Sequence, residues 1–147
     1  MGLPYENASS GDKALGEIQK LLRRFGCAQF GSMVDDEEKT LLVQFKYHGQ
    51  MVSCKASFNG YAQAWLKEHP YTSRMRKSKE EHERQALDVA SIAVYSILRD
   101  WIKGQVTAIE TGILSFEGAF LGQILLPSGK TILEYASDQK LLAGPGR

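Results

Sequence analysis

The chain has 147 residues, which is within the usual size range of a single domain. Apolar residues make up 43% and charged residues 24%, a composition that excludes a disordered, fibrous or membrane-embedded chain. The 18 Lys and Arg residues against 17 Asp and Glu give a net charge of +1, so any attraction to nucleic acid or to a membrane must come from a local patch.

The first predicted element is an amphipathic helix over residues 11–25. The stretch Ser9-Ser10-Gly11-Asp12 offers capping residues at its start, and Gly26 suits the left-handed residue that often follows a helix. Its apolar positions recur at helical spacing and are Ala14, Leu15, Ile18, Leu21, Leu22 and Phe25. A weak strand over 27–34 is expected next.

A hairpin of two alternating strands follows, over 41–47 and 52–58. If His48-Gly49 forms its loop, Phe45 faces Val52 and Val43 faces Cys54. One face is then apolar, and we expect Val43, Phe45, Val52, Cys54 and Phe58 to pack against the first helix. The opposite face carries Gln44, Lys46, Met51, Ser53 and Lys55.

Two helices are predicted after the hairpin. Asn59 can cap a short helix, which should end before Pro70 because proline disfavours helix in the preceding residue. Ser78 and Glu81 then form a capping box at the start of a long helix. The long helix contains a broadly apolar stretch, which indicates a central core helix or a dimer interface.

The length of that second helix is itself informative. Unbroken from Lys79 to Thr111, it would be about 50 Å long, at 1.5 Å per residue. A compact domain of this size has a diameter of only about 38 Å. We therefore expect the helix to break near Gly104 or to project into a partner.

The C-terminal third is expected to contain small elements. Ser115 can start a short helix over 116–121, and residues 124–133 predict a β-hairpin around the Pro127-Ser128-Gly129 turn. The sequence thus predicts one α+β domain over 1–136, built on a three-stranded antiparallel meander, and a frayed tail over 137–147.

The three histidines, His48, His69 and His82, do not have the spacing of metal ligands relative to one another or to cysteines and carboxylates. We expect His48 to lie in a turn and His69 at the end of the short helix. His82 is expected to be exposed in the first turn of the long helix.

Other reactive groups also lack a catalytic pattern. The four adjacent carboxylates at 35–38 are typical of a solvated turn. Cys27 and Cys54 have neither zinc spacing nor the number needed for a disulfide scaffold, so both are expected to be reduced thiols. The sequence predicts no metal, no cofactor, no catalytic residue and no enzymatic activity.

One local charge run lies directly before the long helix. It comprises Arg74, Arg76, Lys77 and Lys79, with Ser78 as the helix cap. Cations are unfavourable at a helix start, because they meet the positive end of the helix dipole, whereas a phosphate is favoured there. Either the run binds phosphate, or it is a solvated connector neutralised by Glu80, Glu81 and Glu83.

A second candidate surface is the polar face of the hairpin, with Lys46 and Lys55. Sheet faces of this kind can bind single strands, but they usually add exposed aromatic side chains for base stacking. The hairpin aromatics point toward the apolar face, and Met51 indicates that a helix could cover the polar face instead.

Residues 99–110, 116–130 and 24–27 resemble small uncharacterised proteins of temperate phages and prophages. The resemblance implies a phage accessory setting, in which nucleic-acid handling and inhibition of host machinery are both common. The order helix, three-stranded meander, helix is also similar in outline to the core of phage single-strand annealing proteins. Neither resemblance supplies a catalytic or binding residue.

The preferred hypothesis is a non-enzymatic, phage-type accessory protein that binds nucleic acid through residues 74–79, with Lys46 and Lys55 as an extension. The alternative is a protein-binding inhibitor or assembly module that docks on a host or phage protein through apolar helix surface between Tyr95 and Ile109. We also expect a homodimer formed through the long helix, a cytoplasmic location and no membrane contact.

Overall fold

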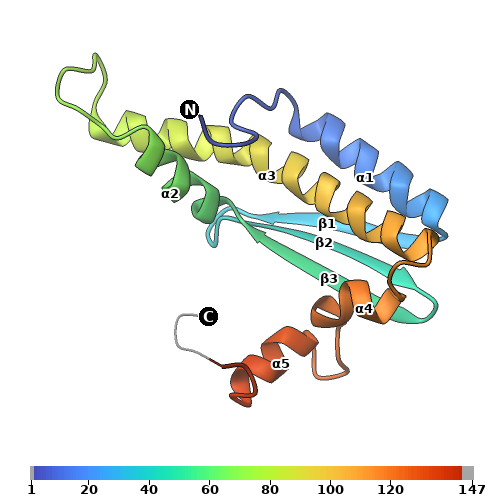
Figure 1. The fold of residues 1–147 in the computed structure, drawn as a ribbon. Helices are drawn as coiled ribbons and strands as arrows, with labels where there is room; N and C mark the ends of the chain where they lie inside the picture. The colour runs from blue at the N-terminus through green and yellow to red at the C-terminus, as the bar shows by residue number, and fades with distance from the viewer. Residues whose placement is uncertain (1, 144–147) are drawn as a thin grey trace.

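An antiparallel three-stranded sheet carries helices across one face, and a small C-terminal module lies beside its last strand (Figure 1). The computed structural model describes residues 2–143. In chain order the elements are α1 (Gly11–Phe25), β1 (Gln29–Asp35), β2 (Thr40–Tyr47), β3 (Gln50–Ser57), α2 (Phe58–Glu68), α3 (Lys79–Glu110), α4 (Phe116–Phe120), η1 (Leu121–Gln123) and α5 (Ile132–Asp138). The predicted α+β class and the antiparallel meander are confirmed.

Helix α1 has the bounds and the caps that its sequence predicts. The Ser10 hydroxyl accepts a hydrogen bond from the backbone N–H of Lys13, at 3.1 Å. Gly26 ends the helix in the left-handed conformation, at φ 106°. Its buried residues form the apolar stripe and are Ala14, Ile18, Leu21, Leu22 and Phe25, whereas Leu15 is only half-buried.

The predicted register of the hairpin is confirmed. Phe45 is paired with Val52 and Val43 with Cys54. His48 and Gly49 connect the strands with φ angles of 49° and 82°. Two consecutive positive φ angles are typical of the tight turn that matches the twist of a hairpin.

The predicted apolar face of the sheet is buried in one hydrophobic core with α1 and α3. Val43, Phe45, Val52 and Cys54 are each at most 4% exposed, and they share a cluster with the α1 residues Ile18, Leu22 and Phe25. Phe58 is also buried in this cluster, but it begins α2 instead of ending the predicted strand. The ring of Phe45 has no exposed surface and meets the edge of Phe120, with ring centroids 5.4 Å apart. The α4 segment therefore closes one end of the core.

Helix α3 continues through Gly104 without interruption, so the expected break there is wrong. Gly104 is exposed, and a Cβ atom built on it would meet no other heavy atom within 4 Å. No packing constraint therefore bends the helix at this residue. The molecule accommodates 32 helical residues because α1 and α2 pack along α3, and its N-terminal end extends beyond the sheet (Figure 1).

The apolar surface of α3 from Tyr95 to Ile109 packs mainly inside this chain. Leu98, Ile102 and Val106 are buried. Tyr95 lies against Phe58, and Trp101 meets Phe120 edge-on. Intramolecular packing thus explains the broad apolar circumference that had suggested docking or dimerisation through this helix.

The C-terminal segment differs from the predicted β-hairpin. Leu125 and Thr131 form a single bridge around the expected turn, and residues 132–138 are helical instead of extended. Thr131 and Glu134 form a capping box, which favours a helix start over a second strand. Helix α5 ends at Asp138, past the predicted domain boundary at 136.

Two contacts attach this C-terminal segment to the outer side of β3. Ile124 forms a bridge with Val52, and the Leu125 amide donates to the carbonyl of Met51 at 2.8 Å. Within residues 2–143, no helix combines the length and the apolar character of a membrane span. Residues 144–147 of the predicted tail lie outside the described part of the chain.

Candidate nucleic-acid interface

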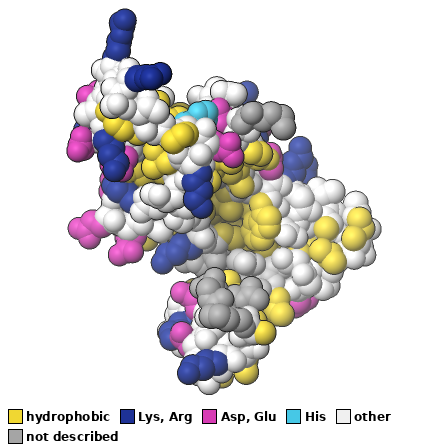
Figure 2. Space-filling model, turned by 60° about the vertical axis from the view of Figure 1, so that its left-hand side comes forward, with side chains coloured by type: hydrophobic (Ala, Val, Ile, Leu, Met, Phe, Trp, Pro, Cys, Tyr) yellow, Lys and Arg dark blue, Asp and Glu magenta, His cyan; other side chains and the backbone are white. Residues whose placement is uncertain are grey.

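The basic segment, residues 74–79, occupies the end of the molecule farthest from the β2–β3 turn (Figure 1). It forms the second half of the loop from α2 to α3 and the first residue of α3. Figure 2, turned to bring this side forward, shows Lys and Arg side chains standing away from the body of the molecule. The segment is therefore accessible to a large partner.

Aromatic side chains anchor the loop that carries the basic segment. The Tyr71 hydroxyl donates to the carbonyl oxygen of Lys77, at 2.9 Å. The Tyr71 ring lies 5.9 Å from the ring of His82, which in turn packs 5.2 Å from Trp65. The amide of Met75 donates to the carbonyl of Thr72 and closes a turn. The loop is thus tied to both flanking helices.

The cations of the basic segment have no carboxylate partners in the described residues. Arg74, Arg76 and Lys79 are exposed, and none takes part in an ion pair. Lys77 is half-buried, and its ammonium group donates to the side-chain oxygen of Gln85. Three of the four predicted cations therefore remain available to an external anion.

The nearby carboxylates do not neutralise this charge by direct contact. Glu81 has a carboxylate oxygen that accepts from the amide and the hydroxyl of Ser78, so it serves the helix cap. Glu80 and Glu83 are exposed and form no ion pair among residues 2–143. Any neutralisation of the run by these carboxylates therefore acts through solvent, and exposed cations without ion pairs are compatible with both a phosphate site and a solvated connector.

Ser78 arranges the start of α3 as predicted. Its hydroxyl accepts from the amide of Glu81 at 3.1 Å and completes the capping box. The amides of Lys79 and Glu80, in the first turn, have no acceptor within the helix. The helix dipole adds positive potential at the same place.

Two further cations lie near the basic segment and were not singled out from the sequence. Lys67 is exposed in the last turn of α2, directly before the loop, and Arg84 is exposed in the second turn of α3. Each is isolated along the sequence, so the charge run did not include it. A search for cations within two helical turns of the loop ends finds both.

Lys46 and Lys55 do not extend the basic segment. Both are exposed, but they belong to the sheet face turned away from α1 and α3, whereas the basic segment lies at the end of the helical layer (Figure 1). Lys55 also lies close enough to Glu134 to contribute to the lowered pKa of that carboxyl, after the larger effect of hydrogen bonds from Thr131. The structure therefore separates the two predicted basic surfaces.

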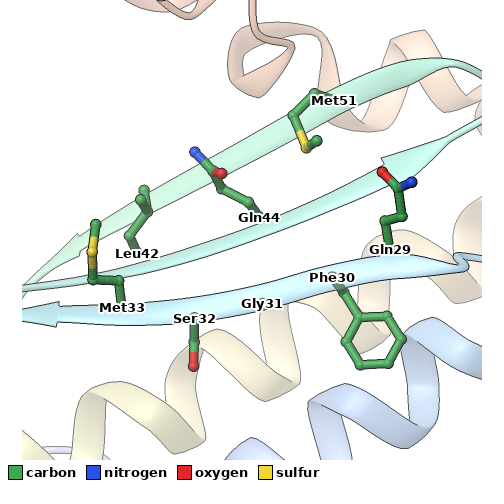
Figure 3. Close-up of a pocket in the computed structure, with 8 residues that line it drawn as sticks. All are labelled: Gln29, Phe30, Gly31, Ser32, Met33, Leu42, Gln44 and Met51. Atoms are coloured by element: carbon green, nitrogen blue, oxygen red, sulfur yellow. The ribbon is translucent and has the colours of Figure 1, made fainter.

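The open face of the sheet forms a shallow depression of about 390 Å³ over β1 and β2 (Figure 3). Gln29, Met33, Leu42, Gln44 and Met51 lie on this side, and Gln44 donates to the hydroxyl of Ser53 at 3.1 Å. Phe30 points to the opposite side, toward the helices (Figure 3). Phe30 is the one aromatic residue among those that line the depression, and its ring points away from it, so the described residues form no stacking platform of the kind typical of single-strand binding.

His82 is buried, and its predicted exposure is wrong. Only 2% of its surface is exposed, and its Nε2 atom lies 2.5 Å from the carbonyl oxygen of His69. The ring fills the space between Trp65 and Tyr71, because α2 and the loop fold over the first turn of α3. His69 ends α2 and His48 lies in the β2–β3 turn, as predicted.

A second cluster of charges ties the N-terminal segment to α1 and α3. Tyr5 donates to Asp100 at 2.6 Å, and Arg99 contacts both Asp100, at 2.9 Å, and Glu17, at 3.0 Å. The hydrogen bond from Arg99, with that from Tyr5, lowers the pKa of Asp100. Because every charge in this cluster has a partner, the arrangement is that of a structural clamp.

The two cysteines are free thiols in the interior. Cys27 is 2% exposed and Cys54 4%. Burial raises the pKa of Cys27 to about 11 and that of Cys54 to about 12. Within the described part of the chain, no three His, Cys, Asp or Glu side chains are grouped so that they could hold a metal ion.

A scan against protein-family models and searches of curated proteins and of solved structures find no match to this chain. The geometry and charge of the basic segment are therefore the features that indicate a function.

Proposed function

We propose that this chain is a non-enzymatic, phage-type accessory protein that binds nucleic acid through the basic segment. One observation carries the proposal: Arg74, Arg76 and Lys79 are exposed on an anchored loop, without carboxylate partners in the described residues. The phage setting comes from the sequence resemblance alone and stays a prediction.

Phosphate is the ligand group that best fits these residues. Guanidinium groups bind phosphate oxygens in a bidentate manner, and the start of α3 offers free amides and a positive dipole end. Such contacts neutralise the backbone of a nucleic acid without reading its sequence. We therefore expect binding to depend strongly on salt and weakly on base sequence.

Anchoring of the loop favours binding as well. Tyr71 and the Ser78 cap hold the backbone on both sides of Arg74 and Arg76. A loop that is already ordered loses less conformational freedom when a ligand binds. Cations on such a loop therefore bind more effectively than the same cations on an unrestrained chain.

The experiment measures binding of labelled single- and double-stranded DNA and RNA by fluorescence anisotropy, from about 50 to 200 mM salt, the range over which phosphate contacts weaken most. The test variant is Arg74→Ala/Arg76→Ala. The matched control is Lys13→Ala/Lys20→Ala, which removes two exposed cations from α1 without touching the loop. Circular dichroism of each variant checks that the fold is kept.

We expect the test variant to weaken binding to every nucleic acid that the wild type binds. Its slope of log affinity against log salt should fall by about one for each lost phosphate contact. The control should bind like the wild type. If the wild type binds none of the four nucleic acids at about 50 mM salt, the proposal is wrong.

A further variant, Lys46→Ala/Lys55→Ala, tests the separation of the two basic surfaces. Because these lysines lie on the open sheet face, away from the basic segment, we expect a short oligonucleotide to bind this variant as well as the wild type. A loss equal to that of the arginine variant would show that the ligand follows the sheet instead.

A further inference from the structure

The outer edge of β1 is the unprotected edge of the sheet. The strand order is β1-β2-β3, so β1 is hydrogen-bonded to a neighbour on one side only. The other edge strand, β3, is contacted by Ile124 and Leu125 of the C-terminal segment. No described residue forms a strand or bridge on the outer side of β1.

The side chains of β1 are also unusually exposed for a strand with apolar residues. Every residue from Gln29 to Asp35 is exposed except the half-buried Phe30. Met33 is 63% exposed and Val34 45%. Edge strands are normally protected by lysine, proline or a bulge, and β1 contains neither lysine nor proline, and its pairing with β2 runs without a bulge.

We propose that two copies of this chain pair edge to edge through β1, antiparallel about a two-fold axis at Ser32, and form a continuous six-stranded sheet. This register aligns all seven residues of each strand, with Gln29 opposite Asp35 of the second copy. Along a strand, the N–H and C=O groups of alternate residues point to opposite edges. Residues that lie opposite each other in this register differ by an even number of positions, so the free N–H and C=O groups of one copy face those of the other. The pairing provides about six to eight backbone hydrogen bonds.

The side chains are self-complementary in this register. Phe30 lies opposite Val34 of the second copy, and both belong to the helix-facing side, where they form an aromatic–β-branched pair. Met33 lies opposite Gly31 of the second copy on the open face. A Cβ built on Gly31 meets nothing within 4 Å, so the methionine side chain has room there.

The charges at the ends of β1 favour a second copy as the occupant. The β1–β2 turn carries Asp36, Glu37 and Glu38, which form no ion pairs among residues 2–143. In the antiparallel pair, this acidic turn extends past the start of β1 in the other copy, where α1 ends. That end carries Arg23, whose guanidinium lies 5.2 Å from the Phe30 ring, and Arg24, which is paired with Glu110 of its own chain at 3.3 Å, so Arg23 is the cation that faces the acidic turn. Each copy thus offers one acidic and one basic end.

Pairing through β1 is independent of the proposed nucleic-acid binding, because it involves neither the basic segment nor α3. It also differs from a dimer through α3, whose apolar surface packs mainly inside the chain. A strand from an unrelated protein could use the same edge. That protein would lack the reciprocal charges, and the wild type alone would then stay monomeric.

Sedimentation velocity and light scattering from about 1 to 200 µM test the pairing, a range that covers the micromolar affinity of a modest interface. Ser32→Lys places two like charges face to face on the two-fold axis and should raise the dimer Kd by about fivefold. Ser32→Glu should do the same. An equimolar mixture of the two variants should dimerise again, because opposite charges then meet.

The matched control is Gln63→Lys, which adds the same charge at an exposed position of α2. It should dimerise like the wild type. Circular dichroism distinguishes lost pairing from lost folding in Ser32→Lys. A wild type that stays monomeric throughout this range, or a dimer that Ser32→Lys leaves unchanged, overturns the proposal.

An oxidative cross-link supplies a second measurement. Ser32→Cys puts two thiols on the axis at about 4.5–5.5 Å between Cα atoms, a separation compatible with a disulfide. Cys27 and Cys54 are buried and do not compete. We expect covalent dimer from Ser32→Cys and none from Gln63→Cys, and equal cross-linking of the two would contradict the pairing.

Discussion

Replacing Gly104 by Ala should stabilise the protein. Glycine inside a helix costs about 0.5–1 kcal/mol relative to alanine, because it loses more backbone freedom on folding. Gly104 lies in an unbroken part of α3, and an added Cβ meets no heavy atom within 4 Å. No packing penalty therefore offsets the gain. For a chain of this size the melting temperature should rise by about 1–4 °C.

Two other glycines supply matched comparisons for this substitution. Gly16→Ala in α1 should have the same effect, because Gly16 is helical and also has open space around its Cβ position. Gly26→Ala should instead destabilise by about 1–2 kcal/mol, since Gly26 ends α1 at φ 106°, where a Cβ is strained. The three substitutions thus differ in backbone conformation and not in the atoms added.

Thermal and urea denaturation of the three variants, monitored by circular dichroism, measures these effects. We expect the free energy of unfolding to increase for Gly104→Ala and Gly16→Ala and to decrease for Gly26→Ala. If Gly104→Ala lowers stability, then Gly104 adopts a conformation that alanine resists, and α3 is broken there as its length alone would suggest. That result would refute the packing argument for the unbroken helix.

Phe45→Ala should cost about 3–5 kcal/mol in the free energy of unfolding, because the ring is fully buried against Phe120; an unchanged urea midpoint would contradict this core assignment. Asp100 has a pKa below its ordinary value of 3.8, owing to Arg99 and then Tyr5, so it stabilises the fold above that pH, and the contribution is lost as the pH falls through the folded-state pKa. Stability of Asp100→Asn should therefore decline less than that of the wild type during acid titration, and parallel curves would argue against the clamp. Cys27 and Cys54 should react with a thiol reagent only after denaturation, since both are buried and have raised pKa values; rapid labelling of the native protein would show that the core opens.

Signals between neighbouring residues predicted the charge run and the helix cap of the candidate site, but not the contacts that surround them. The run from Arg74 to Lys79 and the Ser78 cap are visible in the sequence, because both depend on neighbouring residues. The sequence does not show that Glu80 and Glu83 form no ion pairs with this run among residues 2–143, because that depends on side-chain directions around the first turns of α3. Lys67 lies next to the loop because α2 ends at Glu68, the residue that follows it.

The sequence by itself determined the elements whose causes are local. The alternation around His48-Gly49 predicted the strand register, and the capping stretch from Ser9 to Asp12 with Gly26 predicted both ends of α1, since turns, caps and periodicity involve residues a few positions apart. The start of α5 follows the same rule, because its Thr131–Glu134 capping box is a local signal, although the strand predicted there is wrong.

Only the tertiary structure decided how those elements use their surfaces. His82 is buried because α2 and its loop fold over it, and the apolar side of α3 is internal because α1, α2, α4 and the sheet cover it. Among residues 2–143, the outer edge of β1 stays open because the C-terminal segment returns to β3 at the other side of the sheet. Burial and free edges depend on contacts between residues far apart in the chain, and periodicity along the sequence carries no information about which element supplies them.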